Sequence, residues 1–169
     1  MRETEADLAR LQDLLDESFA AAGPHLLRII TPERRLTAEQ VAERLTGMRL
    51  LALATVTADG RPQVGPVDGV FLRGSFHVGS APDSARARHI AARPQVSATH
   101  LPGEELAVTV HGRAVPVDVQ AEAGAELRQA LLDIYVPRYG PEWETDFLDS
   151  GPVYWRIDAE RMFTFQMTN

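Results

Sequence analysis

The chain has 169 residues, with 17 basic and 24 acidic groups and a formal net charge of −7 at pH 7. It contains no cysteine and no lysine, which excludes disulfides, thiolate nucleophiles, iron–sulfur clusters, Schiff-base chemistry and a P-loop lysine. The negative charge argues against nucleic acid or a membrane as a partner, because such surfaces attract proteins with excess positive charge.

Residues 1–47 are predicted to form a helical N-terminal extension. Thr4 with Asp7, and Thr37 with Gln40, have the three-residue spacing of a capping box, in which two side chains bind the first backbone N–H groups of a helix. Apolar residues follow both boxes at helical spacing. The expected ends of the two helices are Gly23-Pro24 and Gly47.

Residues 49–167 show the short apolar runs and frequent turns of β-strands. The second strand contains Gly65-Pro66, and because proline cannot donate to a strand ladder we expect a bulge or an open edge there. Asp158–Arg161 is expected to be a tight connection between the last two strands. The expected strands are residues 49–57, 61–72, 75–80, 95–101, 106–117, 153–157 and 162–166, and the expected helices are residues 84–93, 120–135 and 142–148.

The sequence has no linker, repeat or low-complexity tract, so we expect a single domain over residues 1–169. Six or seven strands with few helices predict a mainly β, α+β barrel with N-terminal and peripheral helices packed outside. The longest apolar run, Leu50–Val56, is far shorter than a membrane-spanning helix. The start Met1–Glu5 is acidic and unlike a signal peptide, so we expect a cytoplasmic protein.

Residues 61–100 carry a local positive charge, because they contain five arginines and two aspartates. This excess of +3 leaves −10 for the rest of the chain. Within the segment, Ser84, Arg86 and Arg88 lie where a predicted strand is followed by a helix. Helix N-terminal N–H groups, a serine hydroxyl and a guanidinium together form a phosphate site. The same residues also suit a capped helix whose arginines face solvent.

Motifs of several other enzyme classes are absent from the sequence, which has no Gly-x-Ser-x-Gly, His-Glu-x-x-His or Gly-x-Gly-x-x-Gly. Four histidines, His77, His89, His100 and His111, recur at a regular interval. They fall on different predicted elements and lack carboxylates at ligand spacing, so we expect no metal site.

Several short motifs follow one another in a characteristic order. They are Ala52–Pro62 with Val64–Val67, Phe76–Ser80, Asp83–Ile90 with Arg93–Ser97, Val110–Ala114, and Tyr154–Ile157 with Met162–Phe165. This set resembles the opening hairpin, third strand, phosphate-binding turn, fifth strand and closing hairpin of the pyridoxamine 5'-phosphate oxidase-like, FMN-binding split-barrel family. The resemblance covers about residues 50–165. Where the family often has Ser-Arg-Lys, this chain has Ser84-Ala85-Arg86.

The resemblance implies a six- to seven-stranded antiparallel split β-barrel that binds FMN between the two subunits of a homodimer. The phosphate would lie on Ser84 and Arg86, and the flavin ring along the backbone of the strand around Gly65-Pro66. Trp155 lies on a strand that would reach the site of the partner subunit. The expected cofactor-binding residues are Val64, Gly65, Pro66, Val67, Gly79, Ser80, Ser84, Arg86, Arg88 and Trp155.

The resemblance also implies a flavin-dependent oxidoreductase that transfers hydride to or from a small organic substrate. Two alternatives stay open: a reductase that uses a deazaflavin coenzyme, and a flavin-binding carrier or sensor without turnover. True pyridoxamine phosphate oxidases have a C-terminal Arg-x-His pair, and a lysine and a glutamine where this chain has Val70 and Ala107, so we do not expect vitamin oxidase activity. A haem-binding branch uses a C-terminal histidine, whereas the last histidine here is His111. We assign no catalytic residue.

Overall fold

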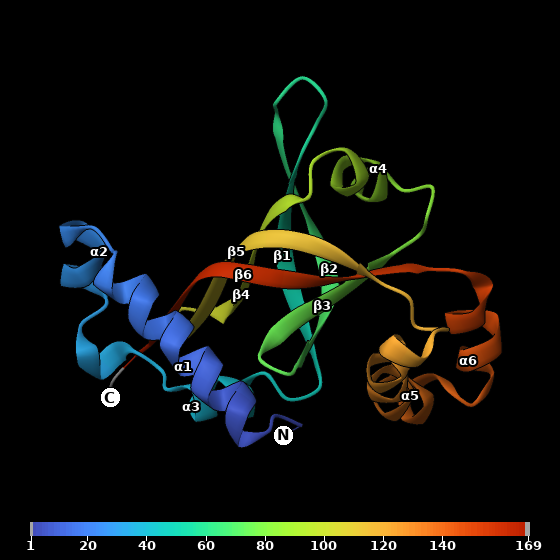
Figure 1. The fold of residues 1–169 in the computed structure, drawn as a ribbon, viewed down its shortest axis with the longest axis horizontal. Helices are drawn as coiled ribbons and strands as arrows, with labels where there is room; N and C mark the ends of the chain where they lie inside the picture. Colours follow the sequence, from blue (N-terminus) through green and yellow to red (C-terminus); the bar gives the residue numbers. More distant parts are fainter. Residues whose placement is uncertain (1, 168–169) are drawn as a thin grey trace.

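The computed structural model describes residues 2–167, which form a closed barrel of six antiparallel strands in the order β1-β2-β3-β6-β5-β4 (Figure 1). The strands are β1 (Met48–Val56), β2 (Pro62–Leu72), β3 (Ser75–Ser80), β4 (Gln95–Gly103), β5 (Leu106–Val117) and β6 (Val153–Gln166). The helices are α1 (Glu5–Ala20), α2 (Pro24–Ile29), α3 (Ala38–Arg44), α4 (Ala85–Ala92), α5 (Ala125–Tyr139) and α6 (Glu142–Asp146), with 3-10 turns η1 (Pro32–Arg34), η2 (Glu122–Gly124) and η3 (Leu148–Ser150). The predicted antiparallel barrel is confirmed, with six strands.

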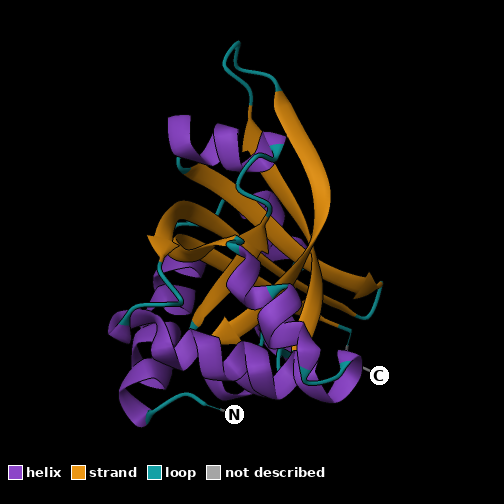
Figure 2. Ribbon diagram, turned by 90° about the vertical axis from the view of Figure 1, so that its right-hand side faces the viewer, coloured by secondary structure: helices purple, strands orange, loops and turns teal. Residues whose placement is uncertain are grey.

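The helices surround the barrel in three groups. In Figure 1 the N-terminal helices α1–α3 and the pair α5–α6 lie on opposite sides of the barrel, and α4 lies beside the upper part of β1 and β2. Figure 2 shows the turn between β1 and β2 projecting beyond the barrel, away from the end where most helices gather. No helix within residues 2–167 is long and apolar enough to cross a membrane.

Both predicted capping boxes are confirmed, because Thr4 and Thr37 each accept a hydrogen bond from the backbone of the third helical residue. Ser18 of α1 accepts a buried 2.9 Å hydrogen bond from the Met162 N–H, which attaches the extension to β6. The first helix ends at Ala20, before Gly23-Pro24, as expected. Pro24 then begins a further short helix, α2, which the sequence did not predict; proline is tolerated there because the first position of a helix needs no N–H donor.

Apolar side chains form two clusters, one on each face of the barrel wall. The first fills the barrel and continues to α1 and α3; Phe76 and Trp155 belong to it. The second lies between α5 and the outer faces of β2 and β6, and includes Val70, Leu131 and Tyr154. Successive side chains of a strand point to opposite faces, so β6 contributes neighbouring aromatics to different clusters. The helix α5 therefore creates a second buried layer outside the barrel.

The strand β2 passes through Gly65-Pro66 without a bulge, because Pro66 pairs with Ala52 in a continuous ladder with β1. On its other side β2 pairs with β3 only from Gly69 onward, so within the described chain residues 62–68 have an open edge there. Proline is tolerated at such an edge since no neighbouring strand needs its N–H. Of the two possibilities raised by the sequence, the bulge is wrong and the open edge is confirmed.

The connection expected at Asp158–Arg161 is wrong, because β6 is one strand that pairs with β5 over its whole length. The ladder shifts register between His111 and Gly112, which leaves Glu160 as the extra residue of a β-bulge. A Cβ at Gly112 would lie 2.1 Å from the carbonyl oxygen of Asp158, so glycine allows the two backbones to approach. A run of polar residues is typical of a turn and of a bulge alike. Here the close approach of β5 at Gly112 makes it a bulge.

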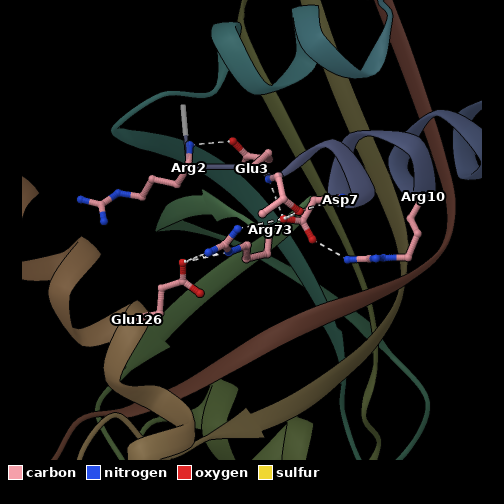
Figure 3. A network of polar contacts seen from close by, with 7 residues as sticks. Arg2, Glu3, Asp7, Arg10, Arg73 and Glu126 are labelled. Carbon is pink, nitrogen blue, oxygen red and sulfur yellow. Dashed lines mark hydrogen bonds and ion pairs between the residues drawn. The ribbon is translucent and has the colours of Figure 1, made fainter.

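Arg73 joins three elements (Figure 3). Arg73 and Gly74 form the two-residue turn between β2 and β3, with φ of 54° and 77°, the left-handed conformation that such hairpins favour. The guanidinium donates to Asp7 of α1 at 3.1 Å and to Glu126 of α5 at 2.8 Å. Arg10 donates to the same Asp7 carboxylate. One hairpin thereby positions the first helix and α5, the helix that covers the outer layer.

Asp7 should contribute to stability through this network. Burial by itself raises the pKa of Asp7, but hydrogen bonds from Thr4 and Arg73 outweigh it and hold the pKa below its ordinary value. We expect Asp7→Asn to lower the free energy of unfolding at pH 7 by about 1–3 kcal/mol, as for the loss of a hydrogen bond to a charged group. Urea denaturation measures this difference.

The loss of unfolding free energy in Asp7→Asn should also depend on pH. A carboxylate whose pKa is lower in the folded state stabilises fully above its unfolded pKa, so the difference between wild type and Asp7→Asn should shrink as pH falls below about 4. Asp13→Asn, on the exposed side of the same helix, is the matched control and should change little. A deficit of equal size at pH 7 and pH 3 would contradict the electrostatic explanation.

Candidate functional site

The turn between β3 and α4 forms the first part of the site. Ser84 is the N-cap of α4, and its Oγ accepts a 3.0 Å hydrogen bond from the Ala87 N–H. The same hydroxyl lies 2.9 Å from Ser80 Oγ. Because a hydroxyl can donate one hydrogen bond and accept two, capping does not exhaust it. The first N–H groups of α4 have no acceptor inside the helix and, with the helix dipole, favour an anion at this end.

Arg86 connects this turn with the open edge of β2. The side chain is half-buried, and its Nη2 donates to the Pro66 carbonyl oxygen at 2.8 Å. A Cβ on Gly65 would lie 3.1 Å from the same Nη2, so the glycine leaves room for the guanidinium. Burial lowers the pKa of Arg86 below its ordinary value, yet a guanidinium remains protonated at neutral pH. We call the group Gly65, Pro66, Ser80, Ser84 and Arg86 the α4 cradle.

The other residues predicted for cofactor binding lie outside the α4 cradle. Arg88 is exposed and donates to the Asp83 carbonyl oxygen at 2.6 Å. Val64 is 70% exposed on the outer face of β2, whereas Val67 and Trp155 have side chains in the barrel core. Val67 and Trp155 could therefore contact a ligand bound to the same subunit only through their backbone. Their role in cofactor binding stays a prediction.

A cavity of about 640 Å³ lies between the outer face of the barrel and α5–α6. It borders Gly79 and Ser80, so it adjoins the α4 cradle. The lining residues are Asp68, Val70, His77, Gly79, Ser80, Ala81, Leu131, Tyr135, Tyr139, Glu142, Trp143, Asp146, Phe147, Pro152 and Tyr154. Of the predicted residues, Gly79 lines the cavity, and Ser80 belongs both to the cavity lining and to the α4 cradle.

Four aromatic side chains from α5 and α6 form one wall of this cavity. Tyr135 stacks on Trp143 with 4.7 Å between ring centroids, and Trp143 stacks on Phe147 at 5.3 Å. Tyr139 lies nearly parallel to Tyr135 at 6.1 Å. None of the four was predicted as a site residue, and the helix expected over residues 120–135 ended four residues before the end of α5. The available signal was their recurrence at every fourth residue, a spacing that places side chains on one side of a helix.

Two tyrosines and one carboxylate meet at the barrel side of the cavity. Tyr154 of β6 packs on its strand partner Gly79, where a Cβ would lie 2.6 Å from the ring. The Tyr135 hydroxyl donates to Asp68 at 3.0 Å. Burial raises the pKa of both tyrosines, that of Tyr154 to about 12, and the nearby Asp68 adds to the effect. Both phenols are therefore neutral at physiological pH.

The charged groups that line the cavity are acidic. They are Asp68, Glu142 and Asp146, and no arginine of residues 2–167 lines it. Burial lowers the pKa of His77 to about 4, so this lining histidine is neutral at pH 7. The cavity is therefore negative, whereas the α4 cradle beside it carries a guanidinium.

The remaining histidines of the regular series have separate hydrogen-bond partners. His89 bonds with a threonine hydroxyl at 3.0 Å, His100 with a backbone carbonyl at 3.0 Å and His111 with a serine hydroxyl at 2.8 Å. Across residues 2–167, no group of three histidine, cysteine, aspartate or glutamate side chains is placed to hold a metal ion.

A family model described as pyridoxamine 5'-phosphate oxidase matches residues 37–165. No curated protein matches the chain significantly. Among solved structures, the heme storage protein HutZ from Vibrio cholerae is 24% identical, with a TM-score of 0.62 over 78% of this chain and 95% of HutZ. An FAD-binding protein from Mesorhizobium loti is 23% identical, with a TM-score of 0.58 over 80% of this chain and 97% of its own.

An F420 reductase is 21% identical to this chain, with a TM-score of 0.56 over 72% of this chain and 94% of the reductase. At these identities the three structures share the barrel fold with this chain. Their descriptions name three different ligands, and a shared fold hosts different functions. The shared fold therefore does not identify the ligand of this chain, which depends on the residues of the site.

The pH dependence of stability tests whether the His77 ring is buried and neutral in the wall of the cavity. Because its pKa is lower in the folded protein, the unfolded chain takes up a proton first and stability falls as pH drops from about 6.5 toward 4. We expect the wild type to lose about 2 kcal/mol from this group between pH 7 and pH 5. His77→Gln should lack this loss, and His25→Gln, on exposed α2, should retain it. Identical pH dependence of unfolding in His77→Gln and wild type would refute a buried neutral ring.

Proposed function

Because the chain belongs to the pyridoxamine 5'-phosphate oxidase family, we propose that it is an oxidoreductase that binds FMN and transfers hydride to or from a small organic substrate. The α4 cradle is the observation that carries this proposal. In it, Arg86 of the helix reaches the Pro66 carbonyl beside the open edge of β2. This contact brings a phosphate-binding group next to backbone that suits a polar ring.

The α4 cradle has the donors that a phosphate needs. Arg86 uses one N–H on Pro66, and a guanidinium has five, so further donors stay available for phosphate oxygens. The hydroxyls of Ser80 and Ser84 and the first backbone N–H groups of α4 add to them. Arg88, exposed two residues further along the helix, adds positive charge. The residues present therefore fit the phosphate end of FMN.

The open edge of β2 suits the polar rim of a flavin ring, because residues 62–68 offer backbone C=O groups and, except at Pro62 and Pro66, N–H groups. The adjoining cavity of about 640 Å³ lies within the range of small-molecule sites, roughly 300–1,000 Å³. Gly79 and Ser80 line this cavity and directly follow Val78, the last residue of β3 that pairs with β2. A ring held along β2 would thus have the cavity beside it for a substrate.

When bound, the flavin supplies the hydride chemistry. Arg86 would hold the phosphate, and its bond to Pro66 fixes the spacing between that end of the site and β2. Aromatic side chains around Trp143 line one side of the cavity. Tyr135 keeps its proton on Oη and donates a hydrogen bond to Asp68, because burial raises the pKa of this phenol. These residues bind and orient, and none is assigned as an acid or base.

Two other functions would use the same site. The likeness to an F420 reductase favours a deazaflavin coenzyme, whose phosphate would also fit the α4 cradle. The likeness to a heme storage protein favours binding without turnover. Absorbance of the purified chain after incubation with FMN, deazaflavin or haem separates the ligands. Anaerobic reduction by NAD(P)H, followed by candidate acceptors, separates turnover from storage, and failure of FMN and deazaflavin to bind at micromolar levels would refute the redox proposal.

We further propose a homodimer formed through the outer faces of β4, β1 and β2. Leu101, Leu50 and Val64 on these neighbouring strands are 63%, 59% and 70% exposed. Ala52 and Pro66 are exposed register partners in the same strip. Contiguous exposed apolar side chains are typical of interfaces. Pro66 belongs to the strip and to the α4 cradle, so a partner docked here would lie next to the phosphate end of the site.

Arg86→Ala tests the phosphate assignment. We expect the variant to bind FMN more weakly by roughly 1.5–3 kcal/mol, the range for a hydrogen bond to a charged group, and to bind riboflavin almost unchanged. Fluorescence titration of both flavins measures the two affinities. Arg28→Ala, an exposed arginine of α2, is the control and should affect neither. Equal losses for FMN and riboflavin would show that Arg86 only supports the local structure.

The double substitution Leu50→Glu with Leu101→Glu tests the dimer. Placing charges in an apolar interface should convert the dimer to a monomer and weaken FMN binding, which sedimentation velocity and flavin titration would detect. Ile29→Glu is matched because Ile29 is also an exposed apolar residue, 45% exposed on α2, and should leave the dimer intact. A wild-type chain that sediments as a monomer with FMN bound would overturn the proposal.

A further inference from the structure

The cavity beside α5 and α6 has a lining rich in aromatic side chains. The rings of Tyr135, Trp143 and Phe147 form an offset series with interplanar angles of 19° and 25°. Aromatic pairs favour offset stacking or edge-to-face contact, and both arrangements accept another flat ring. Tyr154, packed on Gly79, adds an aromatic ring from the barrel side. A planar aromatic ligand would thus find aromatic partners on two sides.

The charges at this cavity select the ligand further. Asp68, Glu142 and Asp146 line it, and His77 beside them is neutral at pH 7. The Asp68 carboxylate accepts one hydrogen bond, from Tyr135, although a carboxylate has about four acceptor positions. An ammonium group entering the cavity would find acceptors and negative charge, whereas a carboxylate or phosphate would be repelled.

The aromatic residues at the rim already contact a cation. The guanidinium carbon of Arg138 lies 5.4 Å from the ring centroid of Tyr139, within the distance at which a ring face attracts positive charge. Arg138 itself is exposed and does not line the cavity. The cavity is lined by three carboxylates and the α4 cradle contains the Arg86 guanidinium, so these two neighbours have opposite charge although they share Ser80.

From this pairing of aromatic rings and carboxylates, we propose that the cavity binds a flat organic cation, an aromatic ring that carries a protonated amine or a quaternary ammonium group. Binding of this class follows from the cavity alone. Its role as the substrate rests on the proposed oxidoreductase function. The proposal excludes phosphorylated and carboxylate substrates, which the three lining carboxylates would repel.

Three small probes test the charge preference on the purified full chain: benzyltrimethylammonium, benzyl alcohol and phenylacetate, which share an aromatic ring and differ in charge. Isothermal titration calorimetry gives the affinities, and quenching of Trp143 fluorescence reports binding at the cavity. We expect the cation to bind about tenfold or more tightly than phenylacetate, with benzyl alcohol between them. Equal affinities, a preference for phenylacetate or no binding of the cation would overturn the proposal.

Variants of the lining residues assign the binding to this cavity. Asp146→Asn on exposed α6, and Asp68→Asn on β2, should each weaken the cation about three- to tenfold and leave benzyl alcohol nearly unchanged. Trp143→Leu should weaken both ligands and abolish the ligand-dependent quenching, while the emission of Trp155 in the barrel core remains. Asp13→Asn on α1 is the matched control and should bind as the wild type does. Circular dichroism verifies folding, and unchanged cation affinity in all three lining variants would place the ligand elsewhere.

Separate titrations of FMN and benzyltrimethylammonium keep this inference apart from the proposed function. If FMN binds and the cation does not, the inference is wrong and the flavin proposal stands. If the cation binds and FMN does not, the cavity assignment is supported and its role as a flavin enzyme's substrate site is lost. Steady-state oxidation or reduction of cationic rather than anionic candidates by the loaded protein then tests the substrate role.

Discussion

The open edge of β2 is the constraint on which the site depends. β2 is longer than β3, so residues 62–68 have backbone groups on one side that β3 does not reach. Arg86 donates to one of these groups, the Pro66 carbonyl oxygen. The helix that carries Arg86 therefore lies beside this edge. The difference in length between β2 and β3 thus brings the α4 cradle together.

A second consequence of the barrel is the layer outside it. Alternation along β6 places Trp155 inside the barrel and Tyr154 outside, where α5 covers it. The turn at Arg73 fixes α5 through Glu126, and so determines where the aromatic wall stands relative to β3. The cavity exists because α5 and α6 cover the barrel wall without filling all the space above Gly79. The cavity lies next to the α4 cradle because β3 ends at Ser80, a residue that belongs to both.

The net charge of the chain does not describe the local charge at the site, because positive and negative residues lie in different segments. A chain of net charge −7 would be expected to repel anions, yet its arginine-rich segment includes the residue that reaches the β2 edge. The acidic remainder of the chain supplies Glu142 and Asp146 to the neighbouring cavity. The acidic cavity and the α4 cradle, which carries a guanidinium, lie side by side because residues distant in sequence meet at Ser80. Long-range averaging of charge therefore says little about a site of this size.

The sequence by itself determined the features that depend on neighbours within a few residues: the caps at Thr4, Thr37 and Ser84, and the alternation of short strands that indicates a barrel. Features that depend on a distant partner were not determined. A polar run before Met162 became a bulge because Gly112 of another strand approaches it, and Pro66 kept its ladder because β3 ends early. The aromatic series of α5 and α6 was visible as a spacing, but only the packing of α5 against β2 and β6 made this series the wall of a cavity, since local sequence does not specify which surfaces meet.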